Sequence, residues 1–222
     1  MRTFHGRFPR MAQPHPAIRG LYAVTDGPRV DLVDACAAAI EGGAALLQYR
    51  DKAGDDVRRL REARALQTLC VDHGVPLIVN DDIELARRVG AAGVHLGEHD
   101  ASPARARARL GEHALIGVSC YDSIERARAF AADPARVDYL AFGAFFASPT
   151  KPAARRATPA LLQEARAFGL PLVAIGGIDA GNARELVDAG ADALAVVSAL
   201  FGARDVRAAA RRIASLFEPR GS

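Results

Sequence analysis

Short apolar segments alternate with segments of helical periodicity along almost the whole chain, and this alternation is the feature that most constrains the fold. The apolar runs predict eight strands, at residues 21–25, 45–49, 76–79, 93–96, 115–120, 139–146, 171–175 and 193–197. The segments between and after them carry apolar residues at helical spacing, at 30–41, 55–73, 83–89, 103–110, 123–132, 158–168, 182–189 and 205–217. Nearly continuous apolar strands separated by helices are typical of a parallel sheet buried on both faces.

Eight consecutive strand–helix units predict an α/β fold with a single (β/α)8 barrel of the TIM type. An open, doubly wound sheet is the alternative, but the regular repeat and the lack of a GxGxxG motif count against it. The 222 residues match a length that one such barrel commonly occupies. We expect the barrel to cover residues 19–218, and residues 1–18, which are basic and interrupted by proline, to form a flexible extension.

Charge and cysteine content bound the partners and the compartment. The net charge is +3 and the arginines are dispersed, so we expect no nucleic-acid partner. We also expect no membrane segment and no signal peptide, because no apolar run is long enough for either. Cys36, Cys70 and Cys120 show neither metal-binding spacing nor a disulfide framework, which favours the reducing cytoplasm. The sequence makes no prediction of the oligomeric state.

Acidic residues follow two neighbouring predicted strands. The third strand stops at Asn80, Asp81 and Asp82, and Asp100 follows the fourth. Parallel strands place their carboxyl ends side by side, so we expect Asp81 and Asp100 to lie close together. Paired carboxylates favour a cation between them, and hard oxygen ligands suit Mg²⁺. The alternative is that these residues only cap the following helix. His95 is expected to line the core or the cavity rather than to bind zinc.

Polar residues two positions apart follow the second strand. Gln48, Arg50 and Lys52 alternate along an extended segment, so their side chains should point to the same side. One amide and two cations directed together suit the binding of a diphosphate. A solvated charged loop is the alternative, and the pattern alone leaves both open.

Hydroxyl groups and a lysine follow the fifth and sixth strands. Ser148, Thr150 and Lys151 lie in a loop over 147–157 and suit phosphate binding or stabilisation of a leaving group. An ordinary surface turn is the alternative. Ser119 ends the fifth strand, where its hydroxyl either reaches the same cavity or is a satisfied polar group.

Glycines and small polar residues follow the last two strands. Gly176 and Gly177 come after the seventh strand, and Val197 and Ser198 after the eighth. Barrel enzymes often bind a phosphate between these two loops, where backbone N–H groups approach the ligand closely. The alternative is that the glycines serve only tight turns.

Together the strand ends predict two anion sites in one cavity, a Mg²⁺–diphosphate site and a monophosphate site. This combination predicts a transferase on small phosphorylated substrates, in which a diphosphate leaves one substrate and a phosphorylated second substrate attacks. No protein nucleophile or general base is evident, which fits catalysis by positioning and by leaving-group stabilisation.

The ordered set of motifs resembles the thiamine phosphate synthase family. The resemblance extends from about residue 21 to residue 201 and is carried by Gln48-x-Arg50-x-Lys52, Val79-Asn80-Asp81-Asp82, Gly93-Val94-His95-Leu96-Gly97 through Asp100, Gly117-Val118-Ser119, Ser148-x-Thr150-Lys151 and Ile175-Gly176-Gly177-Ile178. It implies a (β/α)8 barrel that joins 4-amino-2-methyl-5-hydroxymethylpyrimidine diphosphate to a thiazole phosphate. The implied products are thiamine phosphate and pyrophosphate, the implied cofactor is Mg²⁺, and the implied mechanism is dissociative.

The resemblance also implies a role for each matching residue. The pyrimidine diphosphate would be held by Gln48, Arg50, Lys52 and Asn80, with further contacts from Ser119 and Lys151. Mg²⁺ would be bound by Asp81 and Asp100. The thiazole phosphate would be held by Ser148, Thr150, Gly177, Val197 and Ser198. The catalytic groups would be Arg50, Lys52, Ser119 and Lys151.

Three other functions remain open on sequence alone. A thiazole tautomerase on the same barrel would need no Mg²⁺–diphosphate site, so the retained acids and cations argue against it. A sugar-phosphate isomerase or decarboxylase would need an acid–base array that the strand ends do not supply. A non-catalytic sensor of thiamine precursors would keep the pocket without turnover.

Overall fold

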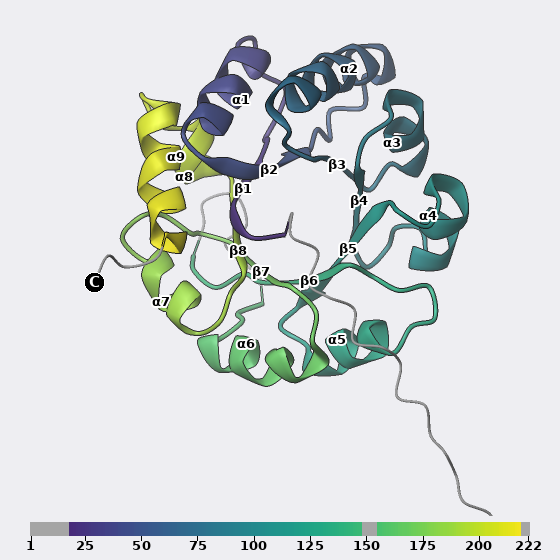
Figure 1. The fold of residues 1–222 in the computed structure, drawn as a ribbon, viewed down its shortest axis with the longest axis vertical. Helices are drawn as coiled ribbons and strands as arrows, with labels where there is room; N and C mark the ends of the chain where they lie inside the picture. The colour runs from purple at the N-terminus through teal and green to yellow at the C-terminus, as the bar shows by residue number, and fades with distance from the viewer. Residues whose placement is uncertain (1–17, 148–154, 219–222) are drawn as a thin grey trace, which may run out of the picture.

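A computed structural model describes residues 18–147 and 155–218 of the chain. Its strands are β1 (Gly20–Val24), β2 (Ala44–Tyr49), β3 (Leu77–Asn80), β4 (Gly93–Leu96), β5 (Leu115–Tyr121), β6 (Tyr139–Phe142), β7 (Leu172–Ile175) and β8 (Ala193–Val196). They are parallel, pair in chain order and close into a barrel through the pairing of β8 with β1 (Figure 1). The predicted (β/α)8 fold is confirmed.

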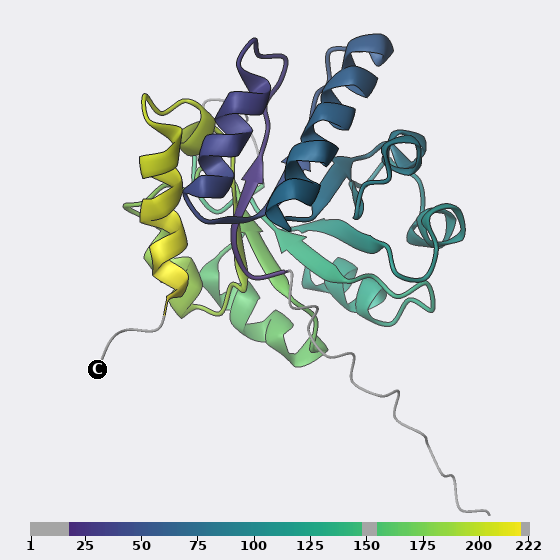
Figure 2. The ribbon, with the colours of Figure 1, turned by 45° about the horizontal axis from the view of Figure 1, so that its top comes forward.

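Helices surround the barrel on its outside in both ribbon views (Figures 1 and 2). They are α1 (Leu32–Glu41), α2 (Asp56–His73), α3 (Ile83–Val89), α4 (Pro103–Leu110), α5 (Ile124–Ala131), α6 (Pro159–Ala165), α7 (Ala183–Asp188), α8 (Ser198–Phe201) and α9 (Val206–Ala214). Two 3₁₀ turns, η1 (Arg166–Phe168) and η2 (Ser215–Phe217), continue α6 and α9. Most predicted boundaries agree to within two residues.

One prediction of local structure was wrong, and one short helix was missed. The sixth strand was expected to reach residue 146 but ends at Phe142, because Ala144 bonds to residues outside the sheet and interrupts the ladder with β7. Ala144 exchanges backbone hydrogen bonds with Arg155 and Ala157, and Phe145 N–H donates to the oxygen of Ile175. The short helix α8 was also not predicted as a separate element, since four residues are too few to show helical periodicity.

Alternate residues of each strand face the two sides of the sheet, and both sides are apolar. In β1, Leu21 and Ala23 pack outward against the helices, whereas Tyr22 and Val24 belong to the cluster inside the barrel. Ile78 of β3 and Val173 of β7 belong to the same inner cluster. Burial of a large apolar side chain stabilises the fold by about 1.5–3 kcal/mol, so the two layers together hold the barrel closed.

Side-chain caps begin several helices and settle one alternative from the sequence. Asp82 accepts a hydrogen bond from the backbone N–H of Leu85 and thus caps α3. Asp81, the preceding residue, makes no such bond. Capping therefore accounts for Asp82 and leaves Asp81 for another role.

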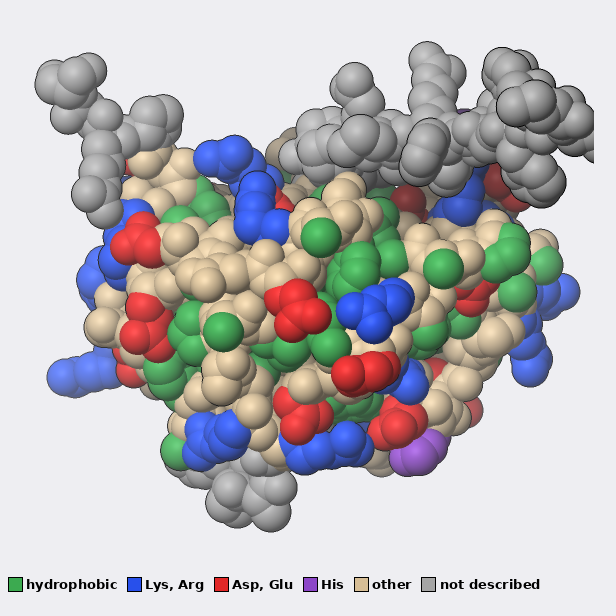
Figure 3. All heavy atoms as spheres, turned by 90° about the horizontal axis from the view of Figure 1, so that it is seen from below, with side chains coloured by type: hydrophobic (Ala, Val, Ile, Leu, Met, Phe, Trp, Pro, Cys, Tyr) green, Lys and Arg blue, Asp and Glu red, His purple; other side chains and the backbone are tan. Residues whose placement is uncertain are grey.

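The surface mixes charges of both signs. On the face shown in Figure 3, Lys and Arg side chains are interspersed with Asp and Glu, without a continuous basic stripe among the described residues. Of the helices within residues 18–147 and 155–218, none has both the length and the apolar character needed to cross a membrane.

Candidate functional site

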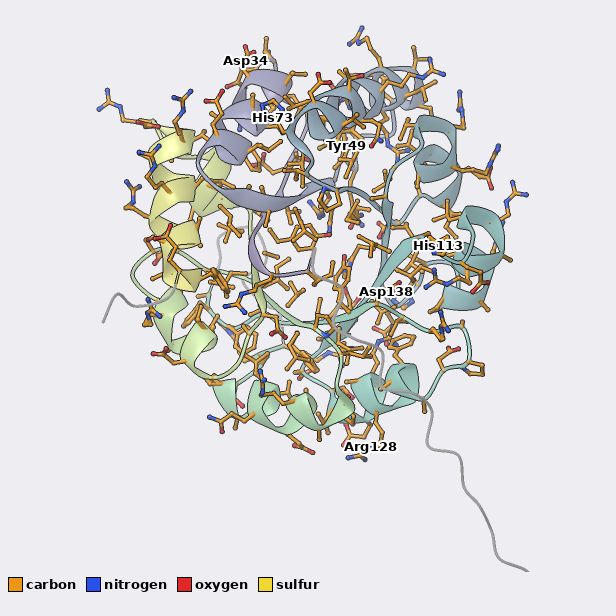
Figure 4. All side chains as sticks on the ribbon, in the orientation of Figure 1. Asp34, Tyr49, His73, His113, Arg128 and Asp138 are labelled. Atoms are coloured by element: carbon orange, nitrogen blue, oxygen red, sulfur yellow. The ribbon has the colours of Figure 1, made fainter. Side chains whose placement is uncertain are left out.

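The carboxyl-terminal rim of the barrel collects the polar residues that follow the strands. Side chains fill the barrel interior (Figure 4). Among the predicted residues, Gln48, Asn80 and Ser119 lie near the carboxyl ends of β2, β3 and β5. β2 and β3 are adjacent in the barrel, and β4 lies between β3 and β5.

Asp81 and Asp100 are brought together at this rim, as expected. The two carboxyl groups lie close enough for Asp100 to affect the pKa of Asp81. Burial raises the pKa of the Asp81 carboxyl, and the contact with Asp100 raises it further, while Lys52 opposes the shift. Two carboxylates that resist joint ionisation form a site that a cation would stabilise.

The local backbone turns Asp81 toward its partner. Asp81 has a φ of 64°, and its N–H donates to the oxygen of His95 at 2.8 Å. A left-handed conformation costs a non-glycine residue about 1–2 kcal/mol. Asp100 is held from the other side, because its Oδ2 accepts from the backbone N–H of Gly97 at 2.6 Å.

Arg50 and Lys52 follow β2, and Lys52 lies beside the acid pair. Lys52 Nζ is 3.1 Å from Asp81 Oδ2. The backbone of Arg50 exchanges two hydrogen bonds with the Thr25 hydroxyl at 2.8 and 3.0 Å, which ties this segment to the end of β1. The residue between them, Asp51, faces the other way and pairs with Arg58 of α2. Asp51 and Lys52 therefore face different ways, while the shared direction of Gln48, Arg50 and Lys52 stays a prediction.

Gln48 points into the barrel rather than outward. It is 4% exposed, and its Nε2 donates to the Tyr22 hydroxyl at 2.8 Å. The Tyr22 hydroxyl contacts that of Tyr139 at 2.9 Å. Sequence reasoning did not single out Tyr22 or Tyr139, although each is a polar aromatic residue within an otherwise apolar strand.

His95 lines the interior, as predicted. Its Nε2 is 2.9 Å from Ser119 Oγ, and its Nδ1 is 3.1 Å from the Tyr139 hydroxyl. Burial lowers the pKa of His95 to about 4, so the ring is neutral at physiological pH. Within the described residues, no group of three or more His, Cys, Asp or Glu side chains forms a metal cage. A metal held here by protein carboxylates would use Asp81 and Asp100 with other oxygen ligands.

The glycines after β7 do more than form a turn. Gly177 has a φ of 65°, and a Cβ built there would lie 2.6 Å from the oxygen of Ala147. The adjacent Gly176 would likewise place a Cβ 2.5 Å from that of Ala144. Only glycine therefore permits the segment after β6 to pass this closely over the end of β7.

The neighbouring strand brings its own backbone to the same rim. β8 pairs with β7, and Val197 and Ser198 follow it directly. Ser198 is the first residue of α8 and is exposed, whereas Val197 is half-buried. Gly177 and Ser198 therefore follow adjacent strands, as the predicted phosphate site requires.

Three predicted residues, Ser148, Thr150 and Lys151, lie outside the described residues, so their roles stay predictions. Arg155, which follows this loop segment and lies within the described residues, was not singled out from the sequence. Its guanidinium lies 3.7 Å from carboxylate oxygens of Glu98 and Asp122, which follow β4 and β5.

Barrel enzymes that act on phosphorylated substrates assemble their sites at this rim from several strand ends. The fold and the arrangement of acids, cations and glycine turns place the chain in that class. A family model described as "Thiamine monophosphate synthase" matches residues 21–200. The chain therefore belongs to the thiamine monophosphate synthase family, and it is a transferase of thiamine biosynthesis.

Individual relatives agree with this assignment over nearly their full length. A thiamine-phosphate synthase of Chromobacterium violaceum is 56% identical over 207 residues, which are 92% of this chain and 99% of that protein. A thiamine-phosphate synthase of Halorhodospira halophila is 53% identical, with 90% and 95% covered. A solved thiamine phosphate pyrophosphorylase from Pyrococcus furiosus superposes with a TM-score of 0.80 at 32% identity, with 90% and 96% covered.

Proposed function

We propose that this enzyme condenses 4-amino-2-methyl-5-hydroxymethylpyrimidine diphosphate with 4-methyl-5-(2-phosphoethyl)thiazole, in a Mg²⁺-dependent reaction that yields thiamine phosphate and pyrophosphate. The proximity of Asp81 and Asp100, with Lys52 Nζ 3.1 Å from Asp81 Oδ2, carries the proposal. A diphosphate bound with a divalent cation needs this combination of oxygen ligands and a flanking ammonium group.

The acid pair fits Mg²⁺ by its own chemistry. The raised pKa of Asp81 reflects burial and a neighbouring carboxyl, and a divalent cation would relieve that repulsion. Mg²⁺ commonly takes one or two carboxylates and completes its shell with water and substrate phosphates. When bound, it would neutralise charge on the diphosphate and so make that group a better leaving group.

The remaining residues of the first site would bind and orient the pyrimidine substrate. Arg50 and Lys52 would pair with diphosphate oxygens, together with Lys151. Gln48, Asn80 and Ser119 would supply neutral hydrogen bonds around the pyrimidine.

Bond breaking then needs no protein base. The C–O bond between the pyrimidine methylene and the diphosphate breaks, and its electron pair leaves with pyrophosphate. The 4-amino group of the pyrimidine ring stabilises the resulting cation. The thiazole nitrogen donates its lone pair to the methylene carbon, which forms the C–N bond of thiamine phosphate. The cations at the rim stabilise the charge that develops on the leaving group.

The second substrate would be held through its phosphate. Gly177, Val197 and Ser198 follow adjacent strands and would present backbone N–H groups, and Ser148 and Thr150 would add hydroxyls. Such binding fixes the thiazole nitrogen relative to the methylene carbon, and this positioning is a large part of catalysis for a bimolecular step.

Because Cys36, Cys70 and Cys120 are buried free thiols, we infer that the reaction takes place in the cytoplasm.

Pyrophosphate release tests the proposal directly. The purified enzyme would receive the pyrimidine diphosphate, the thiazole phosphate and Mg²⁺, and each would be omitted in turn. Release that requires all three supports the synthase. Absence of release in the complete mixture, with both ligands still bound, would contradict it and direct the next assay to thiazole tautomerisation.

A further inference from the structure

A chain of hydrogen bonds crosses the barrel interior between two side chains that are proposed to bind the pyrimidine substrate. It runs from Gln48 through Tyr22, Tyr139 and His95 to Ser119, with successive distances of 2.8, 2.9, 3.1 and 2.9 Å. Its members come from β2, β1, β6, β4 and β5, so five strands contribute one residue each. Gln48, Tyr22 and Tyr139 are each no more than 4% exposed.

The fold makes room for this chain at Gly117. Gly117 is in register with His95 on one side and with Tyr139 on the other. A Cβ at Gly117 would overlap the Tyr139 ring. The missing side chain therefore lets Tyr139 lie across β5 and stack on His95, with ring centroids 5.6 Å apart and planes inclined by 20°. This packing fixes the orientation of the His95 ring.

The first link sets the direction of every later one. Gln48 presents its Nε2 to Tyr22, and an amide nitrogen only donates. Burial raises the pKa of both tyrosines, so both keep their protons. The Tyr22 hydroxyl accepts a hydrogen bond from Gln48. It therefore donates its own hydrogen bond to the Tyr139 hydroxyl, its other partner among the described residues.

The same reasoning continues to the end of the chain. The Tyr139 hydroxyl accepts a hydrogen bond from Tyr22, so it donates its own hydrogen bond to His95 Nδ1. A neutral imidazole whose Nδ1 accepts carries its proton on Nε2, which then donates to Ser119 Oγ. The Ser119 hydroxyl accepts from His95, so its own hydrogen atom is available for another acceptor.

We propose that Tyr22 and Tyr139 are positioning residues that hold His95 in its Nε2–H tautomer and thereby make Ser119 a hydrogen-bond donor toward the substrate pocket. The tautomer is a property of the resting protein. Its benefit to turnover rests on the proposed function, in which Ser119 faces the pyrimidine. An acceptor atom of that ring would accept a hydrogen bond from the Ser119 hydroxyl, and no covalent bond is made or broken in the network.

The tautomer can be measured without substrate. Protonated and unprotonated ring nitrogens of histidine have well-separated ¹⁵N chemical shifts, and His95→Gln identifies the signals of His95 among the six histidines. We expect a protonated Nε2 and an unprotonated Nδ1 in the unaltered enzyme. The opposite tautomer would mean that Gln48 presents its oxygen to Tyr22 and that Ser119 donates to His95, and it would overturn the proposal.

Two single-hydroxyl deletions test the positioning role. Tyr139→Phe keeps the stacked ring but removes the donor to Nδ1, so we expect a mixture of tautomers in the ¹⁵N spectrum. We expect kcat to fall about five- to tenfold, the equivalent of one neutral hydrogen bond, with KM for the thiazole phosphate unchanged. The matched control is Tyr49→Phe, because Tyr49 is equally buried but donates to Glu62 on the outer side of the sheet.

The two readouts separate failure of the inference from failure of the proposed function. In Tyr49→Phe the His95 tautomer should not change. An unchanged tautomer in Tyr139→Phe would refute the positioning role, whatever the activity. A protein without synthase activity would still show the expected tautomer and its loss in Tyr139→Phe.

Discussion

Asp100 adds little to the core, because it is exposed and its carboxylate contacts Asp81 and the backbone of Gly97. We predict that Asp100→Asn keeps the fold, since an amide oxygen still accepts from Gly97, but lowers Mg²⁺-dependent activity by at least about 100-fold. The pKa of Asp81 should fall in the same variant, because one cause of its elevation is gone.

Activity titrated against Mg²⁺, with a thermal melt for each protein, checks this prediction. Glu98→Gln is the control, since Glu98 is an exposed carboxylate on the same loop that lies outside the pair. Wild-type rates in Asp100→Asn at low Mg²⁺ would remove Asp100 from the metal site.

The turn that follows β7 offers a second test, in which steric contact is separated from backbone strain. Gly177 and Gly74 have nearly the same φ, 65° and 66°, but only Gly177 has neighbours that an added Cβ would strike. Strain alone costs about 1 kcal/mol in either position. We predict that Gly177→Ala costs about 1–2 kcal/mol more than Gly74→Ala and selectively raises KM for the thiazole phosphate.

Chemical denaturation and steady-state kinetics with each substrate varied give the two quantities. Equal effects of the two alanine substitutions on stability would mean that the segment after β6 shifts away from the added Cβ at little cost. A rise in KM for the pyrimidine substrate alone would place the phosphate of the thiazole elsewhere.

The packing of α2 against β2 supports the cationic segment from outside. Asp51 has a fully buried side chain, accepts from the backbone of Ala53 and pairs with Arg58. Burial raises the pKa of Asp51, but the hydrogen bonds from Arg58 and Ala53 outweigh it and hold the pKa below its usual value. A lowered pKa means stabilisation that is complete above about pH 4 and is lost as the pH falls through the folded-state pKa.

We therefore predict that Asp51→Asn lowers the free energy of unfolding by about 2 kcal/mol near neutral pH, and by less as the pH is lowered toward about 3. KM for the pyrimidine diphosphate should rise, since Arg50 and Lys52 flank the position. Urea unfolding at several pH values provides the measurement. Asp56→Asn is the control, because Asp56 forms an exposed pair on the same helix. A pH-independent difference would show that the pair contributes through packing alone.

Across the whole molecule, local pattern predicted the barrel because each strand is a short apolar run with a distinct end. The contact of Asp81 with Asp100 followed from the same rule, since parallel neighbours end at one edge. The end of β6 did not follow, because the apolar residues after Phe142 resemble a strand and only their partners reveal otherwise. The contact of Tyr22 with Tyr139 joins residues 117 positions apart, and no local pattern encodes such a pairing.

The last prediction for the whole molecule concerns the residue at which the barrel begins. Ile18 is 2% exposed and packs in the inner cluster with Leu46, Leu115 and Val173, ahead of β1. The sequence assigns residues 1–18 to an extension, whereas burial makes Ile18 part of the barrel. We predict that removal of residues 1–16 changes the free energy of unfolding by less than about 0.5 kcal/mol. Adding Ile18→Ala should then cost about 2–4 kcal/mol. Because Ile18 precedes β1 and lies at the end opposite the rim, kcat should not change in either protein. Urea unfolding and single-substrate kinetics on the two proteins give both numbers. A large loss from the truncation alone would place part of the extension in the folded domain.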